Sequence, residues 1–187
     1  MNKEKGNFFL RSNEVNHISK EDYAKVEVLV NAVKAFARST YQCVYIIDYF
    51  HQDFVYASDN LAYLCGLESE QLMEAGYQMY IDHVPEDDLQ MLLEVNKKGF
   101  DLFNELPVDD RLDYTISYDF HLLNGRHSRL IHHHLTPILL SDDGRIWLAP
   151  LYHLIIDGMK QRLGNVLHAH LGEKVALASL YRIHRLA

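Results

Sequence analysis

The stretch "LDYTISYDFHL" (112–122) decides the fold, because apolar or aromatic residues alternate with mostly polar ones along its whole length. A period of two over this many residues predicts a half-buried β-strand. Asn124-Gly125 follows as a strong hairpin turn, and "SRLIHHHLTPILL" (128–140) returns as a second strand. "RIWLAPLYHLII" (145–156) returns once more, so the C-terminal half predicts a three-stranded antiparallel meander.

Upstream of the meander, the chain predicts a second hairpin and a group of helices. "QCVYIIDYF" (42–50) is β-branched and aromatic on both faces, and "FVYAS" (54–58) follows after a short turn. Short helices then surround Cys65-Gly66, and Pro85 starts a longer helix. Antiparallel strands with helices gathered between them predict an α+β fold.

An amphipathic helix is expected at 19–38, ahead of this body. Ser19 is an N-cap followed by acidic residues, which the helix dipole favours. Its apolar face could pack on the chain's own sheet or on the same helix of a second copy. We expect a homodimer through this helix, because an isologous interface needs only one self-complementary patch. The residues of that patch are Val26, Val30, Val33 and Phe36.

Composition excludes several classes of function. The 187 residues carry a net charge of −8. Residues 1–156 carry −11 and 157–187 carry +3, so the acidic body repels phosphate backbones and should not bind DNA. No apolar run is long enough for a bilayer and no signal peptide is evident, which predicts a cytoplasmic protein without membrane contact.

The order of strands and helices, with "VPEDDLQ" at the entry of the long helix, resembles the PAS domain. Several stretches are closer still to the sensor domain of bacterial LuxR-type transcription regulators. They are "YIIDYFHQDFVYASDN", "LCGLESEQL", "AGYQMYIDHVPEDDL", "NKKGF", "YTISYDFHL" and "IHHHLTPILL" through "IWLAPLYHLII". The resemblance covers 40–156, with 1–39 as a lead-in and flanking helix and 157–187 as a C-terminal extension.

The resemblance implies a PAS fold, in which a five-stranded antiparallel sheet cups a small cavity beneath helices on one face. It also implies a helix-turn-helix domain after the sensor. Residues 157–187 have about half the length that such a domain requires, so we expect DNA contact only through an output domain outside this chain. We expect 157–187 to add a strand or helix to the body, and 1–18 to be a loose lead-in.

A small ligand of unknown identity, without a known cofactor, is expected in the cavity. Cys65 invites comparison with PAS relatives that bond flavin through a cysteine in G-x-N-C-R-F-L-Q. "YLCGLES" lacks those neighbours, so a buried structural thiol is the better interpretation. The residues expected to line the cavity are Tyr56, Leu64, Cys65, Tyr80, Phe120 and His134.

The histidines raise the alternative of a metal-dependent enzyme. His132 and His134 share one face of a strand, with His121 on the neighbouring strand, but no cysteine or acid recurs at a matching offset. The sequence has no nucleophile elbow, P-loop or HExxH motif. We therefore expect no catalytic or metal-binding residues and interpret the chain as a sensory module. A pure dimerisation domain with a filled core is the other alternative.

Overall fold

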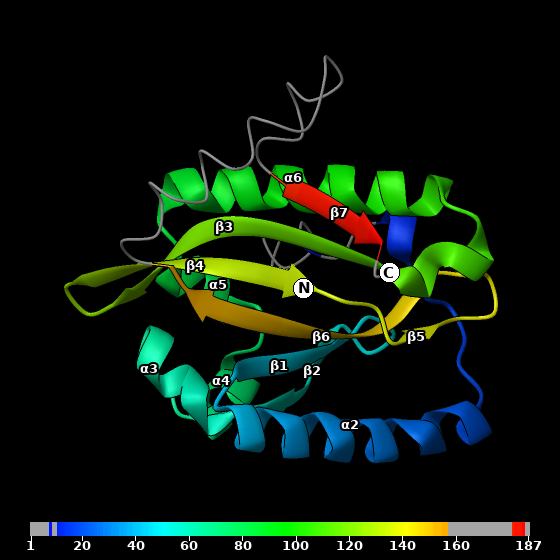
Figure 1. Ribbon diagram of the computed structural model, residues 1–187, viewed down its shortest axis with the longest axis horizontal. Helices are drawn as coiled ribbons and strands as arrows, with labels where there is room; N and C mark the ends of the chain where they lie inside the picture. Colours follow the sequence, from blue (N-terminus) through cyan, green and yellow to red (C-terminus); the bar gives the residue numbers. More distant parts are fainter. Residues whose placement is uncertain (1–7, 9–10, 157–180, 186–187) are drawn as a thin grey trace.

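An antiparallel sheet organises the molecule (Figure 1). The computed structural model describes Phe8, residues 11–156 and the strand at 181–185. Within these residues the sheet has seven strands in the order β2-β1-β6-β4-β3-β7, and β5 pairs with β6 beside this path. The strands are β1 (Cys43–Asp48), β2 (Asp53–Ala57), β3 (Tyr114–Asn124), β4 (His127–Leu135), β5 (Leu139–Leu140), β6 (Ile146–Ile155) and β7 (Tyr181–Arg185).

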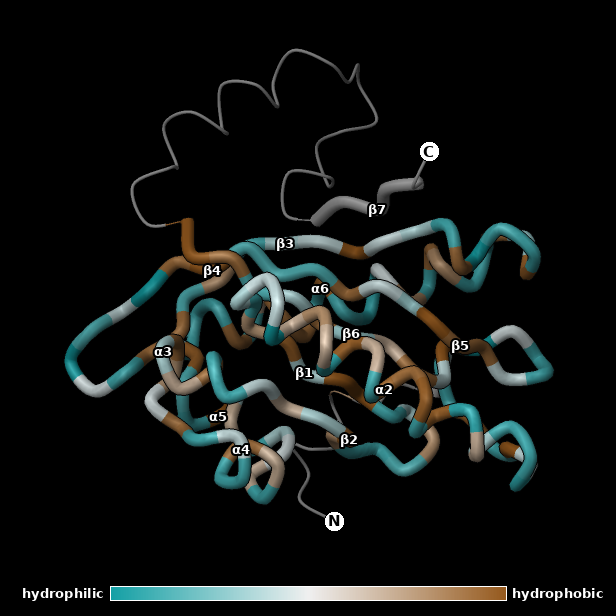
Figure 2. Tube along the Cα trace, turned by 60° about the horizontal axis from the view of Figure 1, so that its bottom comes forward, coloured by the Kyte–Doolittle hydropathy of each residue, from teal (hydrophilic) through white to brown (hydrophobic). Residues whose placement is uncertain are grey.

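Helices lie on both faces of this sheet. The helices between β2 and β3 pack on the inner face, and α2 lies across the outer face of β1 and β6 (Figures 1 and 2). None of the helices in the described part of the chain is long and apolar enough to cross a bilayer. The helices are η1 (Arg11–Asn13), α2 (Lys20–Thr40), η2 (Asp59–Leu61), α3 (Ala62–Cys65), α4 (Ser69–Ala75), α5 (Gln78–His83), α6 (Glu86–Glu105) and η3 (Val108–Asp113).

The structure confirms the α+β class and the meander. Asn124 pairs with His127 around a two-residue turn, and Gly125 takes a φ of 59° that an L side chain adopts only with strain. Counting back from this turn places Tyr118 opposite His133. The turn therefore sets which residues of β3 and β4 share a face of the sheet.

The expected helix boundaries around α2 and α3 are also confirmed. The Ser19 side chain accepts a hydrogen bond of 3.0 Å from the Asp22 amide and caps α2. Gly66 ends α3 in the left-handed region at a φ of 78°. A Cβ there would lie 2.7 Å from the Asn124 side chain, so glycine meets both a conformational and a steric requirement.

The sheet is larger than the five strands expected. The predicted strand at 128–140 breaks near Pro137 into β4 and β5, because proline cannot donate to the strand ladder. At the other edge, β7 pairs antiparallel with β3, with Tyr118 opposite Tyr181. The C-terminal extension thus contributes a strand at 181–185, and the rest of its expected structure lies outside the described residues.

The N-terminal lead-in packs on the body where a loose segment was expected. Phe8 and Val15 are buried in the main core, and the Asn13 side chain bonds the main chain of Ile146 in both directions. The two bonds measure 3.0 and 2.9 Å and hold this segment against the start of β6. The sequence of 1–18 has no periodicity because isolated side chains, rather than a helix or strand face, make these contacts.

Candidate functional site

The inner face of the sheet carries a continuous group of aromatic and histidine rings, which we call the inner ring cluster. It lies between the sheet and the helices that follow β2, and all its members are buried. Neighbouring ring centroids lie between 4.6 and 6.5 Å apart, the range of favourable aromatic contacts. The members on the strands are Tyr45, Phe54, Tyr118, Phe120, His133 and His153, and those on the helical side are Tyr77 and Tyr80.

Two buried imidazoles meet at the centre of this cluster. Nδ1 of His133 and Nε2 of His153 lie 2.9 Å apart, within hydrogen-bond distance across β4 and β6. His133 stacks on Tyr118 and His153 stacks on Tyr45, with centroid distances of 4.6 and 5.0 Å. A pair of neutral rings can share one proton in such a bond, whereas two charged rings would repel each other.

Burial keeps both imidazoles neutral. It lowers the pKa of His133 well below the usual range for histidine, and the neighbouring His153 lowers it further. Burial also lowers the pKa of His153 to about 3, although the main chain of Cys43 offsets part of this effect. Near pH 7 the cluster therefore offers uncharged hydrogen-bonding groups in an apolar setting.

Oη of Tyr45 and Nε2 of His133 have no hydrogen-bond partner among the described residues, and both side chains are 0% exposed. An unsatisfied buried polar atom costs about 1–3 kcal/mol. A bound molecule with an uncharged hydrogen-bonding group would remove this cost, and such atoms often mark functional sites.

Phe8 closes the cluster on its helical side. Its ring stacks on Tyr80 at 5.2 Å with an interplanar angle of 28°, and it lies 5.3 Å from Tyr77. The side chain is 3% exposed. The space expected to form a cavity beneath the helices is therefore occupied by the rings of the cluster and by Phe8.

Four of the six residues expected to line the cavity lie in the inner core. Tyr80 and Phe120 belong to the inner ring cluster, and Leu64 and Cys65 are buried in the same core. The Cys65 thiol donates to the Leu61 carbonyl at 3.5 Å, and burial raises its pKa. This supports the interpretation of Cys65 as a structural thiol.

Tyr56 and His134 were expected in the cavity, but they lie on the opposite side of the sheet. Tyr45 faces inward and pairs with Ala57, so Tyr56 points outward toward α2. On β4, His133 faces inward opposite Tyr118. His134 points outward, on the same face as His132. Cross-strand partners lie on the same face of the sheet. A prediction that is off by one residue along the strand therefore selects a side chain on the opposite face.

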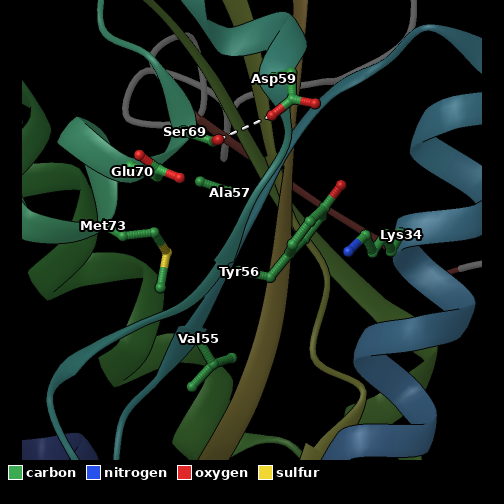
Figure 3. Close-up of a pocket in the computed structure, with 8 residues that line it drawn as sticks. All are labelled: Lys34, Val55, Tyr56, Ala57, Asp59, Ser69, Glu70 and Met73. Carbon is green, nitrogen blue, oxygen red and sulfur yellow. Dashed lines mark hydrogen bonds between the residues drawn. The ribbon is translucent and has the colours of Figure 1, made fainter.

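Tyr56 instead lines a surface groove of about 470 Å³ beside the edge strand β2 (Figure 3). Its ring points toward Lys34 of α2, whereas Met73 and Glu70 of α4 approach from the other side. The Ser69 hydroxyl donates to Asp59 at 2.8 Å, which satisfies one polar contact of the groove. The groove is open to solvent, and it lacks the enclosed, unpaired polar atoms of the inner ring cluster.

A buried carboxylate that the sequence did not single out holds α2 on the outer face. Asp48 is 0% exposed and accepts hydrogen bonds from the Tyr23 hydroxyl and, at 2.9 Å, from the Phe50 amide. His51 Nδ1 lies 2.8 Å from the same carboxylate. Burial and the hydrogen bond with Asp48 raise the pKa of Tyr23, so the Tyr23 hydroxyl keeps its proton and donates a hydrogen bond to the Asp48 carboxylate.

The four residues expected at a dimer interface lie on the side of α2 that faces the chain's own sheet. Val26 is 6% exposed in a core with Ile46 and Leu148, and Val30 and Val33 are partly buried against it. Phe36 is 46% exposed and lies edge-on to the Tyr152 ring. The patch is thus used within the chain, and a dimer contact through α2 would involve its other side.

The outer face also carries the histidines considered as metal ligands. His132 and His134 lie on one face as expected, with ring centroids 4.3 Å apart. Nδ1 of His132 lies 2.5 Å from Asp119, and Nδ1 of His121 lies 2.7 Å from Asp88 in the first turn of α6. In the described part of the chain, no three histidine, cysteine or acidic residues group closely enough to hold a metal ion.

Comparisons with known proteins give similarity in structure only. No family model and no curated protein matches the sequence. One similar solved structure is the N-terminal domain of a diguanylate cyclase with a PAS/PAC sensor from Marinobacter aquaeolei. It has 12% sequence identity and a TM-score of 0.47, and the match covers 62% of this chain and 94% of that chain. A PAS domain from Colwellia psychrerythraea has 18% identity and a TM-score of 0.48, and covers 69% and 97%.

A third similar structure is the phage VqmA protein in complex with DPO. It has 14% identity and a TM-score of 0.46, and the match covers 78% of this chain but only 61% of the phage protein. At these identities the similarity concerns the fold.

Proposed function

We propose that this chain is a sensory module that binds a small uncharged molecule within the inner ring cluster. The observation that carries the proposal is the pair of buried polar atoms, Tyr45 Oη and His133 Nε2, that lack hydrogen-bond partners among the described residues. A core built only for stability would place apolar groups there, because unsatisfied polar groups destabilise it. The sheet-and-helix fold supports this role by enclosing the cluster between two layers.

The output of the module is proposed to be transcription regulation of the LuxR type. This part rests on the sequence resemblance of 40–156 and on charge. The acidic residues 1–156 carry −11, so contact with DNA falls to a separate output domain. In this arrangement the chain has no catalytic role, and ligand binding changes the position of the helices that cover the sheet.

Native mass spectrometry tests the ligand after the protein is incubated with a small-molecule extract of cells. We expect the wild type to retain a small molecule, and His133→Leu to lose it because the variant removes a hydrogen-bonding atom. His132→Leu is the matched control, since its side chain lies on the outer face, and it should retain the molecule. Absence of any bound molecule in the wild type, or equal retention by both variants, would falsify the proposal.

The same spectra test for a metal-dependent enzyme. Stoichiometric zinc that disappears in both His132→Ala and His134→Ala would favour that alternative, because these two rings lie together on the outer face. The sensory proposal expects the mass of the protein to be unchanged by a chelator.

A homodimerisation module is the second candidate. The observation that favours it is an exposed apolar side chain on the solvent-facing side of α2, Val28, which is 70% exposed. Light scattering of the wild type and of Val28→Glu tests it, with Asn31→Glu on the same helix as a charge-matched control. A dimer that Val28→Glu alone dissociates supports this candidate, and a monomeric wild type excludes it.

A further inference from the structure

Phe8 precedes the segment 40–156 in the sequence, but its side chain packs inside the core of that segment. The body that resembles a sensor begins near residue 40, yet the Phe8 ring is 3% exposed within its core. The ring packs against Tyr77 and Tyr80, at the end of the inner ring cluster nearest α5. A side chain far away in sequence therefore supplies a ring that the body's own residues do not.

A separate anchor holds the segment that follows Phe8. Asn13 makes two hydrogen bonds with the Ile146 main chain, of 3.0 and 2.9 Å, and the Asn104 side chain donates to the Ser12 carbonyl at 2.8 Å. Val15 is buried at 7% exposure just beyond them. These contacts do not involve the Phe8 ring, so the ring can leave its place while the anchor stays in contact with the body.

The place of Phe8 is connected to the unpaired polar atoms through the rings between them. The Tyr80 ring contacts Phe8 on one side, and its centroid lies 6.4 Å from that of Tyr45 on another. Tyr80 also contacts Phe120, which in turn contacts His133 at 5.5 Å. A ring in the place of Phe8 is thus separated by Tyr80 from the hydroxyl of Tyr45, and by Tyr80 and Phe120 from the imidazole of His133.

We propose that the place of Phe8 is the binding site for a small, flat aromatic molecule with an uncharged hydrogen-bonding group. Phe8 is its intramolecular occupant and leaves when the molecule binds. The inference rests on the proposed sensory function and adds the class of ligand and the means of regulation. An aromatic ligand replaces the ring contacts of Phe8, and a shift of Tyr80 lets its polar group satisfy atoms that phenylalanine cannot reach.

The tether of Phe8 sets a threshold for this ligand. A group attached through a short stretch of chain has an effective concentration of about the millimolar range. The apparent affinity of the ligand is reduced by the fraction of molecules in which Phe8 occupies the site. Removal of the Phe8 ring should therefore tighten binding without a change in the site itself.

Thermal unfolding of the full chain with phenol as the probe tests this. Phenol is flat, uncharged and carries one hydroxyl, whereas benzene has the ring alone. We expect phenol to raise the Tm of Phe8→Ala by roughly 2–4 °C above its effect on the wild type. Benzene should raise it less, and a second change, His133→Leu, should remove the difference between the two probes.

Phe100→Ala is the matched control, because Phe100 is also a fully buried ring of the same core, at 1% exposure, and it contacts Tyr49 instead of Tyr77 or Tyr80. If phenol raises the Tm of Phe100→Ala above the effect of benzene by as much as it does for Phe8→Ala, any cavity in the core gives this effect and the proposal is overturned. Equal effects of both probes on Phe8→Ala also overturn it.

Hydrogen exchange on the wild type provides a measurement that does not depend on the folding of a variant. Saturating phenol should speed exchange of the Phe8 amide and leave that of Val15 unchanged. Unchanged exchange at Phe8 overturns the displacement. A cellular ligand that binds without this change leaves the sensory function standing, whereas a phenol response without any cellular ligand supports the site and removes the sensory role.

Discussion

The two faces of the sheet differ in the partners of their histidine and acidic side chains. On the outer face, Asp48 accepts from Tyr23 and from main-chain amides, and His132 meets Asp119 at 2.5 Å. On the inner face, Nδ1 of His133 and Nε2 of His153 lie 2.9 Å apart, and burial keeps both imidazoles neutral. The difference teaches that hydrogen bonds to carboxylates hold α2 and surface side chains in place, whereas the interior contains uncharged polar groups, which we propose are available to a ligand.

The largest expected effect is the loss of a ring from the inner face. Phe120→Ala should lower the free energy of unfolding by about 3–5 kcal/mol, because Phe120 is 1% exposed and its neighbours cannot close the space. Urea unfolding measures it. Leu112→Ala, at a side chain that is 45% exposed, is the control and should change stability by less than about 0.5 kcal/mol. A loss near 1 kcal/mol for Phe120→Ala would mean that the inner face is loosely packed.

Acid should weaken the inner face more than the outer face. The folded pKa of His153 is about 3, below the usual unfolded value of about 6.5. Stability is therefore full above pH 6.5 and falls as the unfolded state takes up protons, by about 2 kcal/mol between pH 6.5 and 5 for this group. Urea unfolding at several pH values should give a flatter profile for His153→Gln, and an unchanged one for His127→Gln at an exposed position. Identical profiles for all three proteins would show that the fold does not lower the pKa of His153.

On the outer face, two valines of α2 give a matched comparison. Val26 is 6% exposed against the sheet, and Val28 is 70% exposed on the same helix. Val26→Ala should cost about 1.5 kcal/mol for two buried methyl groups, and Val28→Ala less than about 0.5 kcal/mol. Equal losses in urea unfolding would contradict the packing of α2 on its own sheet.

The smallest effect is expected at the start of α2. Ser19→Ala removes the side-chain acceptor of the Asp22 amide and should lower the free energy of unfolding by about 1 kcal/mol. Ser128→Ala, at an exposed strand position, should have almost no effect. If both variants are equally stable, the attachment of α2 begins at Tyr23 and Asp48 and the cap contributes little.

Much of the site could have been predicted from the hairpin turn alone. A two-residue turn at Gly125 and Arg126 pairs Tyr118 with His133, which places His133 inside once Tyr118 is assigned to the core. The alternation along 112–122 predicts that Tyr118 and Phe120 share one face, but the residue predicted beside them in the cavity was His134. Three consecutive histidines give no hydropathy contrast, so only the register of the turn distinguishes them.

Other contacts could not have been found by pattern. Phe8 and Asn13 lie in a segment without periodicity, and the Asn13 side chain bonds a main chain 133 residues away. In the sequence, Asp48 has the pattern of an ordinary residue at the end of a strand. In the structure it is fully buried, and Tyr23 and two main-chain amides donate hydrogen bonds to its carboxylate. Contacts made by single residues over long separations leave no local signature.

The sequence by itself determined the strands, the turn at Gly125, the cap at Ser19 and the α+β class, because each depends on neighbours in the chain or on a short period. Only the tertiary structure decided that α2 packs on its own sheet and that Phe8 fills the interior. These choices are set by which surfaces meet, and an apolar stripe has the same pattern whichever partner covers it.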